Sequence, residues 1–299
     1  MRKEAHVDHS FQQYLLSKQT VDDRALNKDV IDALRVNLPP EPITMIEVGA
    51  GIGTMLKRLV EWEILCSGEY VLVDGMQENI IYAREWIPQW AQAFGLSVEW
   101  IGQDLRLFGS GHDLKIRLEC ADAFDFIHKN TRPADLLIAH AFLDLLPMPE
   151  SLEKLLKLTN GLAWLTINFD GVSTLLPEID HAYDEKIESL YHSTMDTRLS
   201  GGDSRIGRRL FEYLRNMEAR ILAAGASDWV VHANDGKYPA AEKDFLRFVL
   251  GFFADSLQGY DELQGPAFKK WLARRHEQIE CGELVYIAHQ MDFLIRKQS

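Results

Sequence analysis

Continuous apolar runs, separated by segments that favour helices, dominate the chain from residue 43 onward. Strands that are buried on both faces of a parallel sheet have such runs, whereas strands with one solvent face alternate apolar and polar residues. This order of elements predicts a doubly wound α/β sheet with right-handed crossovers. The predicted strands are Ile43–Val48, Tyr70–Val73, Leu114–Cys120, Asp135–Ala139 and Leu162–Phe169, and the predicted helices between them are Thr54–Ile64, Glu78–Phe94, Phe124–Lys129 and Glu150–Leu158.

Two further patterns lie before and within this core. Residues 11–37 carry apolar positions near helical spacing, and the prolines at 39, 40 and 42 end that pattern. The stretch Val98–Ile101, followed by the turn signal Gly109-Ser110-Gly111, predicts an extra strand or a hairpin ahead of the third core strand. The first segment therefore predicts helices before the sheet and the second predicts an addition to the sheet.

After the fifth strand the alternation is interrupted twice. A polar segment over 171–203 predicts one insertion, and a helical segment over about 239–281 predicts a second one before a last strand that begins near Glu283. Between the insertions we expect an amphipathic helix, Arg205–Ala223, that is capped by Gly225. A sixth strand, Asp228–His232, is expected to follow this helix.

A glycine-rich turn gives the clearest chemical signal. The pattern acid-x-G-x-G-x-G runs from Glu47 to Gly53, directly after the first strand and directly before a helix. Glycines let the backbone approach a ligand closely, and the helix start adds unpaired N–H groups. A dinucleotide fingerprint requires G-x-G-x-x-G, but Thr54 and Leu56 stand where its third glycine is needed. A carboxylate at the strand end also repels a pyrophosphate and suits an ammonium or sulfonium cation.

With this turn, the chain resembles the class I S-adenosylmethionine-dependent methyltransferases, motif by motif from about residue 43 to 170 and more loosely beyond. The resemblance implies a Rossmann-like, doubly wound, seven-stranded sheet, mostly parallel with an antiparallel last strand, and helical cap insertions. It implies S-adenosyl-L-methionine as the cofactor. Asp74, at the end of the second strand, would then hold the ribose hydroxyls, and Asp122 would receive the adenine amine, although either residue also suits an N-cap. The implied cofactor-binding residues are Glu47, Gly49, Ala50, Gly51, Gly53, Asp74, Gly75, Met76, Asp122, Ala123 and His140.

His140, at the carboxyl end of the fourth strand, is the candidate catalytic base. An imidazole titrates near neutral pH and suits a hydroxyl or protonated amine acceptor. The same position equally suits a residue that lines the pocket without moving a proton, so both interpretations stay open. The candidate substrate residues are Asp144, Asp170, Tyr183 and His192.

Composition narrows the range of partners. The chain has 32 basic and 45 acidic side chains, a net charge of −13, which argues against nucleic-acid substrates and leaves a small molecule as the expected acceptor. The three cysteines are far apart, so neither a metal site nor a disulfide framework is expected. No apolar leader or membrane-spanning stretch is evident, and we expect a cytoplasmic protein that is a candidate homodimer.

These patterns predict a helical lid over residues 1–37 and a methyltransferase domain over 38–299, with insertions at about 171–203 and 239–281. The predicted reaction transfers a methyl group to an O or N atom of a small molecule. Two alternatives remain open. One is a non-catalytic homologue that keeps the nucleoside pocket, and the other is an NAD-linked oxidoreductase on a similar fold.

Overall fold

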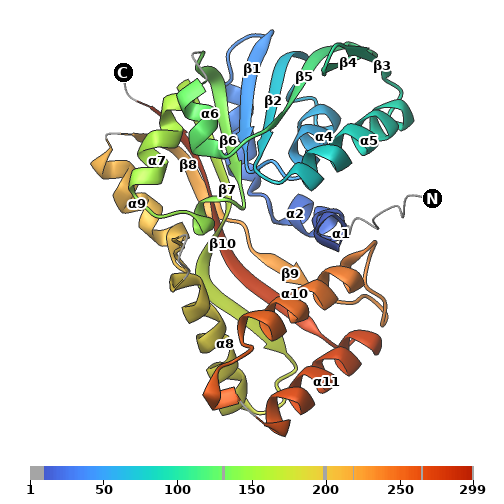
Figure 1. Ribbon diagram of the computed structural model, residues 1–299, viewed down its shortest axis with the longest axis vertical. Coiled ribbons are helices and arrows are strands. Elements are labelled where there is room, and N and C mark those ends of the chain that lie inside the picture. Colours follow the sequence, from blue (N-terminus) through green and yellow to red (C-terminus); the bar gives the residue numbers. More distant parts are fainter. Residues whose placement is uncertain (1–9, 130–131, 198–200, 218, 264, 298–299) are drawn as a thin grey trace, which may run out of the picture.

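The computed structural model describes residues 10–129, 132–197, 201–217, 219–263 and 265–297 (Figure 1). Its strands are β1 Ile43–Val48, β2 Ser67–Asp74, β3 Ser97–Ile101, β4 Asp104–Gly109, β5 His112–Cys120, β6 Ala134–His140, β7 Thr159–Leu176, β8 Arg220–Ala226, β9 Trp229–Val231 and β10 Val285–Arg296. Its α-helices are α1 Ser10–Ser17, α2 Gln19–Ala25, α3 Lys28–Asn37, α4 Thr54–Glu61, α5 Gln77–Ala93, α6 Ala123–Lys129, α7 Glu150–Leu155, α8 His181–Asp196, α9 Ile206–Asn216, α10 Glu242–Ser256 and α11 Pro266–Glu280. Short 3-10 turns are formed by Leu143–Leu145, Leu156–Leu158 and Asp261–Leu263.

Within these described ranges the strands form one ten-stranded sheet in the order β3-β4-β5-β2-β1-β6-β7-β10-β8, with β9 paired to β10 beside this path. Strands β5, β2, β1, β6 and β7 are parallel, and β10 is antiparallel to both of its neighbours β7 and β8. The predicted doubly wound, mostly parallel sheet with an antiparallel last strand is therefore confirmed. The predicted number of seven strands is too low, because the hairpin β3–β4 extends one edge and β9 adds to β10.

Helices cover both faces of the core sheet. One face packs against α3, α4 and α5 through side chains such as Leu34, Leu59 and Ile87. The other face packs against α6, α7 and α9 through side chains such as Leu152 and Leu210. Burial on both faces is the reason that the core strands carry continuous apolar runs.

The strands β7 and β10 continue past the core and carry a second layer of helices, which fills the lower half of Figure 1. We call this part the cap lobe; it consists of residues 170–197, 228–263 and 265–289, which include α8, β9, α10 and α11. At its boundary with the core, the backbone of Ile167 has a φ of 56°, and its N–H donates to the buried Asp292 carboxylate at 2.7 Å. Because a β-branched residue rarely adopts this conformation, Asp292 helps to hold the irregularity at which the register of β7 and β10 shifts.

The predicted helix Arg205–Ala223 is wrong in its second half. Helix α9 ends at Asn216, and Arg220–Ala226 forms strand β8, which pairs with β10. Gly225 therefore lies within a strand opposite Asp292 and caps no helix. The sixth core strand in chain order is therefore β8. The predicted sixth strand, Asp228–His232, corresponds to β9, Trp229–Val231, which lies in the cap lobe. Leucine and alanine in this segment favour a helix locally, but pairing with a buried central strand outweighs that preference.

Candidate functional site

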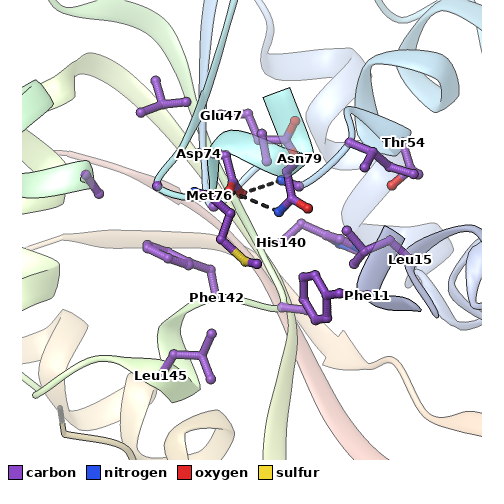
Figure 2. Close-up of a pocket in the computed structure, with 18 of the residues that line it drawn as sticks. Phe11, Leu15, Glu47, Thr54, Asp74, Met76, Asn79, His140, Phe142 and Leu145 are labelled. Atoms are coloured by element: carbon purple, nitrogen blue, oxygen red, sulfur yellow. Dashed lines mark hydrogen bonds between the residues drawn. The ribbon is translucent and has the colours of Figure 1, made fainter. Parts of the chain in front are cut away.

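A cavity of about 270 Å³ lies at the carboxyl ends of β1, β2, β5 and β6, beside helix α1 (Figure 2). Ten of the eleven cofactor residues named from the sequence line this central cavity: Glu47, Gly49, Ala50, Gly51, Asp74, Gly75, Met76, Asp122, Ala123 and His140. The remaining lining residues were not named from the sequence: Phe11, Leu15, Lys18, Ile52, Thr54, Val73, Asn79, Ala121, Ala141, Phe142 and Leu145. Phe11 and Leu15 approach from α1, opposite Phe142 and Leu145.

The glycine turn is shaped by close contacts as well as by backbone conformation. Gly49 and Gly51 have φ values of 63° and 57°, in the left-handed region that favours glycine. A Cβ on Gly49 would stand 2.3 Å from the Phe142 ring, and one on Gly51 would stand 2.9 Å from Leu15. Gly53 does not line the cavity; it precedes α4, where a Cβ would meet Leu72 at 2.7 Å. The first two glycines are thus needed for the cavity wall, and the third for packing.

Asp74 ends β2 and is fixed by three donors. Its Oδ2 accepts from the Gly51 N–H at 2.8 Å, and its Oδ1 accepts from the Met76 N–H at 2.8 Å and from Asn79 Nδ2 at 3.0 Å (Figure 2). Gln12 of α1 in turn donates to Asn79 Oδ1 at 2.7 Å. Burial raises the pKa of Asp74 above its usual value, while these donors oppose that shift. A carboxylate has about four acceptor sites, so Asp74 retains capacity for a ligand hydroxyl.

Asp122 caps helix α6 and also lines the central cavity. Its Oδ1 accepts from the N–H groups of Phe124 and Asp125 at 2.8 and 3.3 Å, which caps the start of α6. The same residue lines the central cavity. Capping therefore fixes this side chain at the cavity wall.

A buried charge network, formed by Lys18, Asp22, Arg58 and His140, lies beside the cavity. Asp22 Oδ2 lies 3.2 Å from Lys18 Nζ, 3.4 Å from Arg58 Nη2 and 3.1 Å from His140 Nε2. Its Oδ1 accepts from Trp229 Nε1 at 2.9 Å. Burial alone would raise the pKa of Asp22, but the nearby cations and the His140 hydrogen bond hold it well below its usual range. The network joins α2 to α4, β6 and β9.

His140 has both ring nitrogens engaged. Asp22 can only accept, so Nε2 carries the proton, and Nδ1 accepts from the Thr166 hydroxyl at 2.8 Å. Burial lowers the pKa of His140 to about 4, with Lys18 and Arg58 adding to the effect and Asp22 opposing it. The imidazole is therefore neutral at pH 7, and a base role would require Nδ1 to leave Thr166.

Glu47 lies in the cavity wall and is 2% exposed. Its Oε2 accepts from the Tyr70 hydroxyl at 2.5 Å. Burial raises the pKa of Glu47 to about 8, although the Tyr70 hydrogen bond opposes the shift. The structure thus places a neutral carboxylic acid in the cavity at pH 7.

The four candidate substrate residues do not line the central cavity. Asp170 accepts from Arg208 Nε at 2.8 Å, and His192 lies 2.7 Å from the Ser173 hydroxyl in a groove between α8 and β7. Tyr183 lines a separate groove between α8 and α11. Asp144 lies in a 3-10 turn beside Leu145, which does reach the cavity.

In the described ranges, no group of three His, Cys, Asp or Glu side chains could hold a metal ion. In the same ranges, no helix combines the length and the apolar character needed to cross a membrane.

No protein-family model and no curated protein matches the sequence. Among solved structures, YjhP from E. coli is 13% identical, with 96% of this chain and 100% of that chain covered and a TM-score of 0.50. A SAM-dependent methyltransferase from Thiobacillus denitrificans, solved with S-adenosyl-L-homocysteine, is 13% identical over 98% of this chain and 100% of that chain, with a TM-score of 0.47. The cyclopropane synthase MmaA2 from Mycobacterium tuberculosis is 11% identical over 98% and 95%, with a TM-score of 0.46.

The strand order β5-β2-β1-β6-β7-β10-β8, with β10 antiparallel, defines the class of fold. The chain therefore has a Rossmann-like, doubly wound α/β fold, as the resemblance stated above predicted. The central cavity lies at the carboxyl ends of the parallel strands, where open α/β sheets bind their ligands.

Proposed function

We propose that this protein is an S-adenosyl-L-methionine-dependent methyltransferase that transfers a methyl group to an O or N atom of a small-molecule acceptor. One observation carries the proposal: a single cavity brings together the glycine turn, Glu47 and Asp74. The turn also lacks the G-x-G-x-x-G spacing of a dinucleotide site, since Thr54 and Leu56 stand where the third glycine is needed, and this weighs against the NAD-linked alternative.

The residues of the cavity fit the parts of this cofactor. Asp74 has acceptor capacity for a ribose hydroxyl, and Glu47 offers an oxygen to a cationic group. Lys18 lines the same cavity and offers an ammonium to a carboxylate. When bound, the cofactor supplies an electrophilic methyl group on its sulfonium. The protein then chiefly aligns donor and acceptor, an effect worth roughly 7–11 kcal/mol in favourable cases.

In this proposal His140 serves as a pocket residue. Its two hydrogen bonds, to Thr166 and Asp22, fix the ring in the cavity wall. Direct attack by a neutral amine needs no base before transfer. A hydroxyl acceptor would need one, and His140 could act only after giving up the Thr166 hydrogen bond.

The N-terminal helices act as a lid in this proposal, since Phe11, Leu15 and Lys18 line the cavity from above the sheet. A small acceptor is supported by the net charge of −13 and by the apolar side chains Phe11, Phe142 and Leu145 around the cavity. The cytoplasmic location and the homodimer stay predictions.

Thermal unfolding with S-adenosylmethionine, S-adenosylhomocysteine and NAD tests the cofactor. A ligand at a hundred times its Kd stabilises by about 2.7 kcal/mol, which raises Tm by several degrees. We expect this rise with both adenosyl ligands and none with NAD. Asp74→Ala should abolish the rise, whereas Asp113→Ala, at an exposed aspartate paired with Arg106, should retain it.

The proposal would be overturned if Tm rises with NAD alone, or if none of the three ligands raises it. If the adenosyl ligands bind, formation of S-adenosylhomocysteine from S-adenosylmethionine with a panel of small amines and alcohols separates the enzyme from a non-catalytic homologue.

A further inference from the structure

Glu47 is a buried acid without a cationic partner. In the part of the chain that the structure describes, no lysine, arginine or histidine nitrogen forms an ion pair with its carboxyl group. Its hydrogen bond comes from the Tyr70 hydroxyl, which is itself fully buried in β2. A neutral donor compensates only part of the cost of burying a charge.

The charged groups around Glu47 are already paired with one another. Two cations face it: Arg58 from α4 and Lys18 from the junction of α1 and α2. Arg58 pairs with Asp22 and Asp23, and Lys18 pairs with Asp22. From β2, Tyr70 and Asp74 also face Glu47, and the neighbouring strand β6 presents the neutral His140. The surroundings therefore offer little to stabilise a second buried anion.

A ligand with a positive charge changes this balance. The Glu47 side chain lines the central cavity, so an ammonium or sulfonium group bound there would face its carboxyl group. A nearby cation favours the ionised form of a carboxyl group. The pKa of about 8 in the empty cavity would then fall on binding.

We propose that a cationic ligand binds the carboxylate form of Glu47, that the empty cavity holds the protonated form, and that binding therefore releases one proton to the solvent. Tyr70 is the positioning residue, since its hydroxyl fixes Oε2 and stabilises the carboxylate when it forms. The identity of the ligand rests on the proposed function, whereas the proton release is a separate claim.

Calorimetric titration with S-adenosylhomocysteine at pH 7, in phosphate and in Tris buffer, measures the proton directly. The observed binding enthalpy should change with the ionisation enthalpy of the buffer, with a slope that corresponds to release of about one proton. 5′-Methylthioadenosine, which has the nucleoside but no ammonium group, should bind with a slope near zero. S-adenosylmethionine, which adds the sulfonium, should release no fewer protons than S-adenosylhomocysteine.

The pH dependence of affinity provides a second measure. Since only the carboxylate form binds, the affinity for S-adenosylhomocysteine should rise about tenfold per pH unit between pH 6 and 7.5. Glu47→Gln keeps the size of the side chain but cannot titrate. This variant should bind more weakly, with a flat profile and no buffer-dependent enthalpy.

Tyr70→Phe separates positioning from simple structural support. Loss of the hydroxyl should weaken binding and move the pH profile to higher pH, because the carboxylate loses its donor. Tyr238→Phe is the matched control: that hydroxyl donates to the Leu284 carbonyl at 2.8 Å, outside the cavity. It should leave affinity and profile unchanged.

The outcomes distinguish the two claims. If S-adenosylhomocysteine fails to bind wild-type protein at any pH from 6 to 8.5, the proposed function fails. If it binds with equal enthalpy in both buffers, or if Glu47→Gln keeps the full pH dependence, proton release is wrong and the proposed function stands. An unchanged profile in Tyr70→Phe would remove the positioning role of Tyr70.

Discussion

Glu47 and His140 lie on the neighbouring strands β1 and β6, and burial moves their pKa values in opposite directions. In each case the neutral form is favoured, because an apolar interior penalises the charged one. Asp22, by contrast, is equally buried but ionised, since Lys18 and Arg58 lie within ion-pair distance. The cavity wall thus holds two neutral titratable groups, with a compensated charge network beside it.

The raised pKa of Glu47 has a direct consequence for stability. Between its unfolded value, near 4.5, and its folded value, about 8, the native state holds more protons than the unfolded state. The free energy of unfolding of the ligand-free protein therefore falls as pH rises through this window. From pH 7 to pH 8 we expect a loss of about 1 kcal/mol, measured by urea denaturation.

The other buried groups with shifted pKa values change the free energy of unfolding mainly below pH 7. The pKa of Asp292 is raised by burial to about 6 and that of Glu188 to about 7, while His140 titrates near pH 4. Glu47→Gln serves as the control and should remove most of the loss between pH 7 and 8. An equal loss in that variant would assign the effect to other groups.

Sequence patterns could identify the cavity residues that lie at strand ends, but not those that reach the cavity from helices. Lys18 reaches the cavity from the N-terminal helices, and Asn79 supports Asp74 from the first turn of α5. Neither position has a local signal, because their partners are set by tertiary packing. Tyr183 and His192 lie in one short segment of the sequence. On α8, however, they are about two and a half helical turns apart, so they face different grooves.

At the scale of elements, the glycine turn between β1 and α4 packs against the segment that follows β6. Gly49→Ala places a methyl group 2.3 Å from the Phe142 ring and also strains a left-handed residue. We expect a loss of about 2–4 kcal/mol in unfolding free energy, the sum of conformational strain and overpacking. Chemical denaturation measures it.

Gly95→Ala is the matched control for this substitution. Gly95 has a φ of 95° with no atom near its missing Cβ, so only strain of about 1–2 kcal/mol should be seen. In a Phe142→Ala background, Gly49→Ala should cost about the same as Gly95→Ala. A cost that is unchanged by Phe142→Ala would show that the ring contact does not limit this turn.

The boundaries predicted from the sequence match the structure where local propensity and tertiary packing favour the same element. β1 was predicted to the residue, and α5 and α6 to within one residue at each end. The turn Gly109-Ser110-Gly111 does mark a hairpin, but it joins β4 to β5, while β3 and β4 meet at Gly102-Gln103. β8 was missed because its alanines and leucine favour a helix, and only β10, far along the chain, makes it a strand.

At the scale of the whole molecule, the cap lobe is closed by a buried ion pair between two of its helices. Arg275 of α11 is fully buried and lies 2.8 Å from Asp184 of α8. It also donates to the Pro177 carbonyl at 2.7 Å, and Trp271 Nε1 donates to the same Asp184 carboxylate. Asp184 Oδ2 accepts from the backbone N–H groups of Ile179 and Asp180, so Arg275 is the cation that compensates its charge.

Arg275→Met should destabilise the protein by about 3–5 kcal/mol, because it leaves the Asp184 carboxylate buried without its cation. Arg274→Met is the control, since Arg274 is exposed and pairs only at the surface, and it should cost less than about 1 kcal/mol. Urea unfolding gives both values, and hydrogen exchange should show the added opening in α8 and α11. Equal effects of the two substitutions would contradict the assigned role of the buried pair.

The place of β10 between β7 and β8 bears on how the protein is made. Asn168 of β7 and its partner Met291 are 123 positions apart, so β7 leaves the ribosome long before the strand that will cover its edge. At roughly 5–20 residues per second, this delay is about 6–25 s. Throughout that interval the nascent chain presents an unpaired, apolar strand edge, a template for association with other chains. Chaperones that bind nascent chains at the ribosome and shield such edges should accordingly raise the yield of soluble protein.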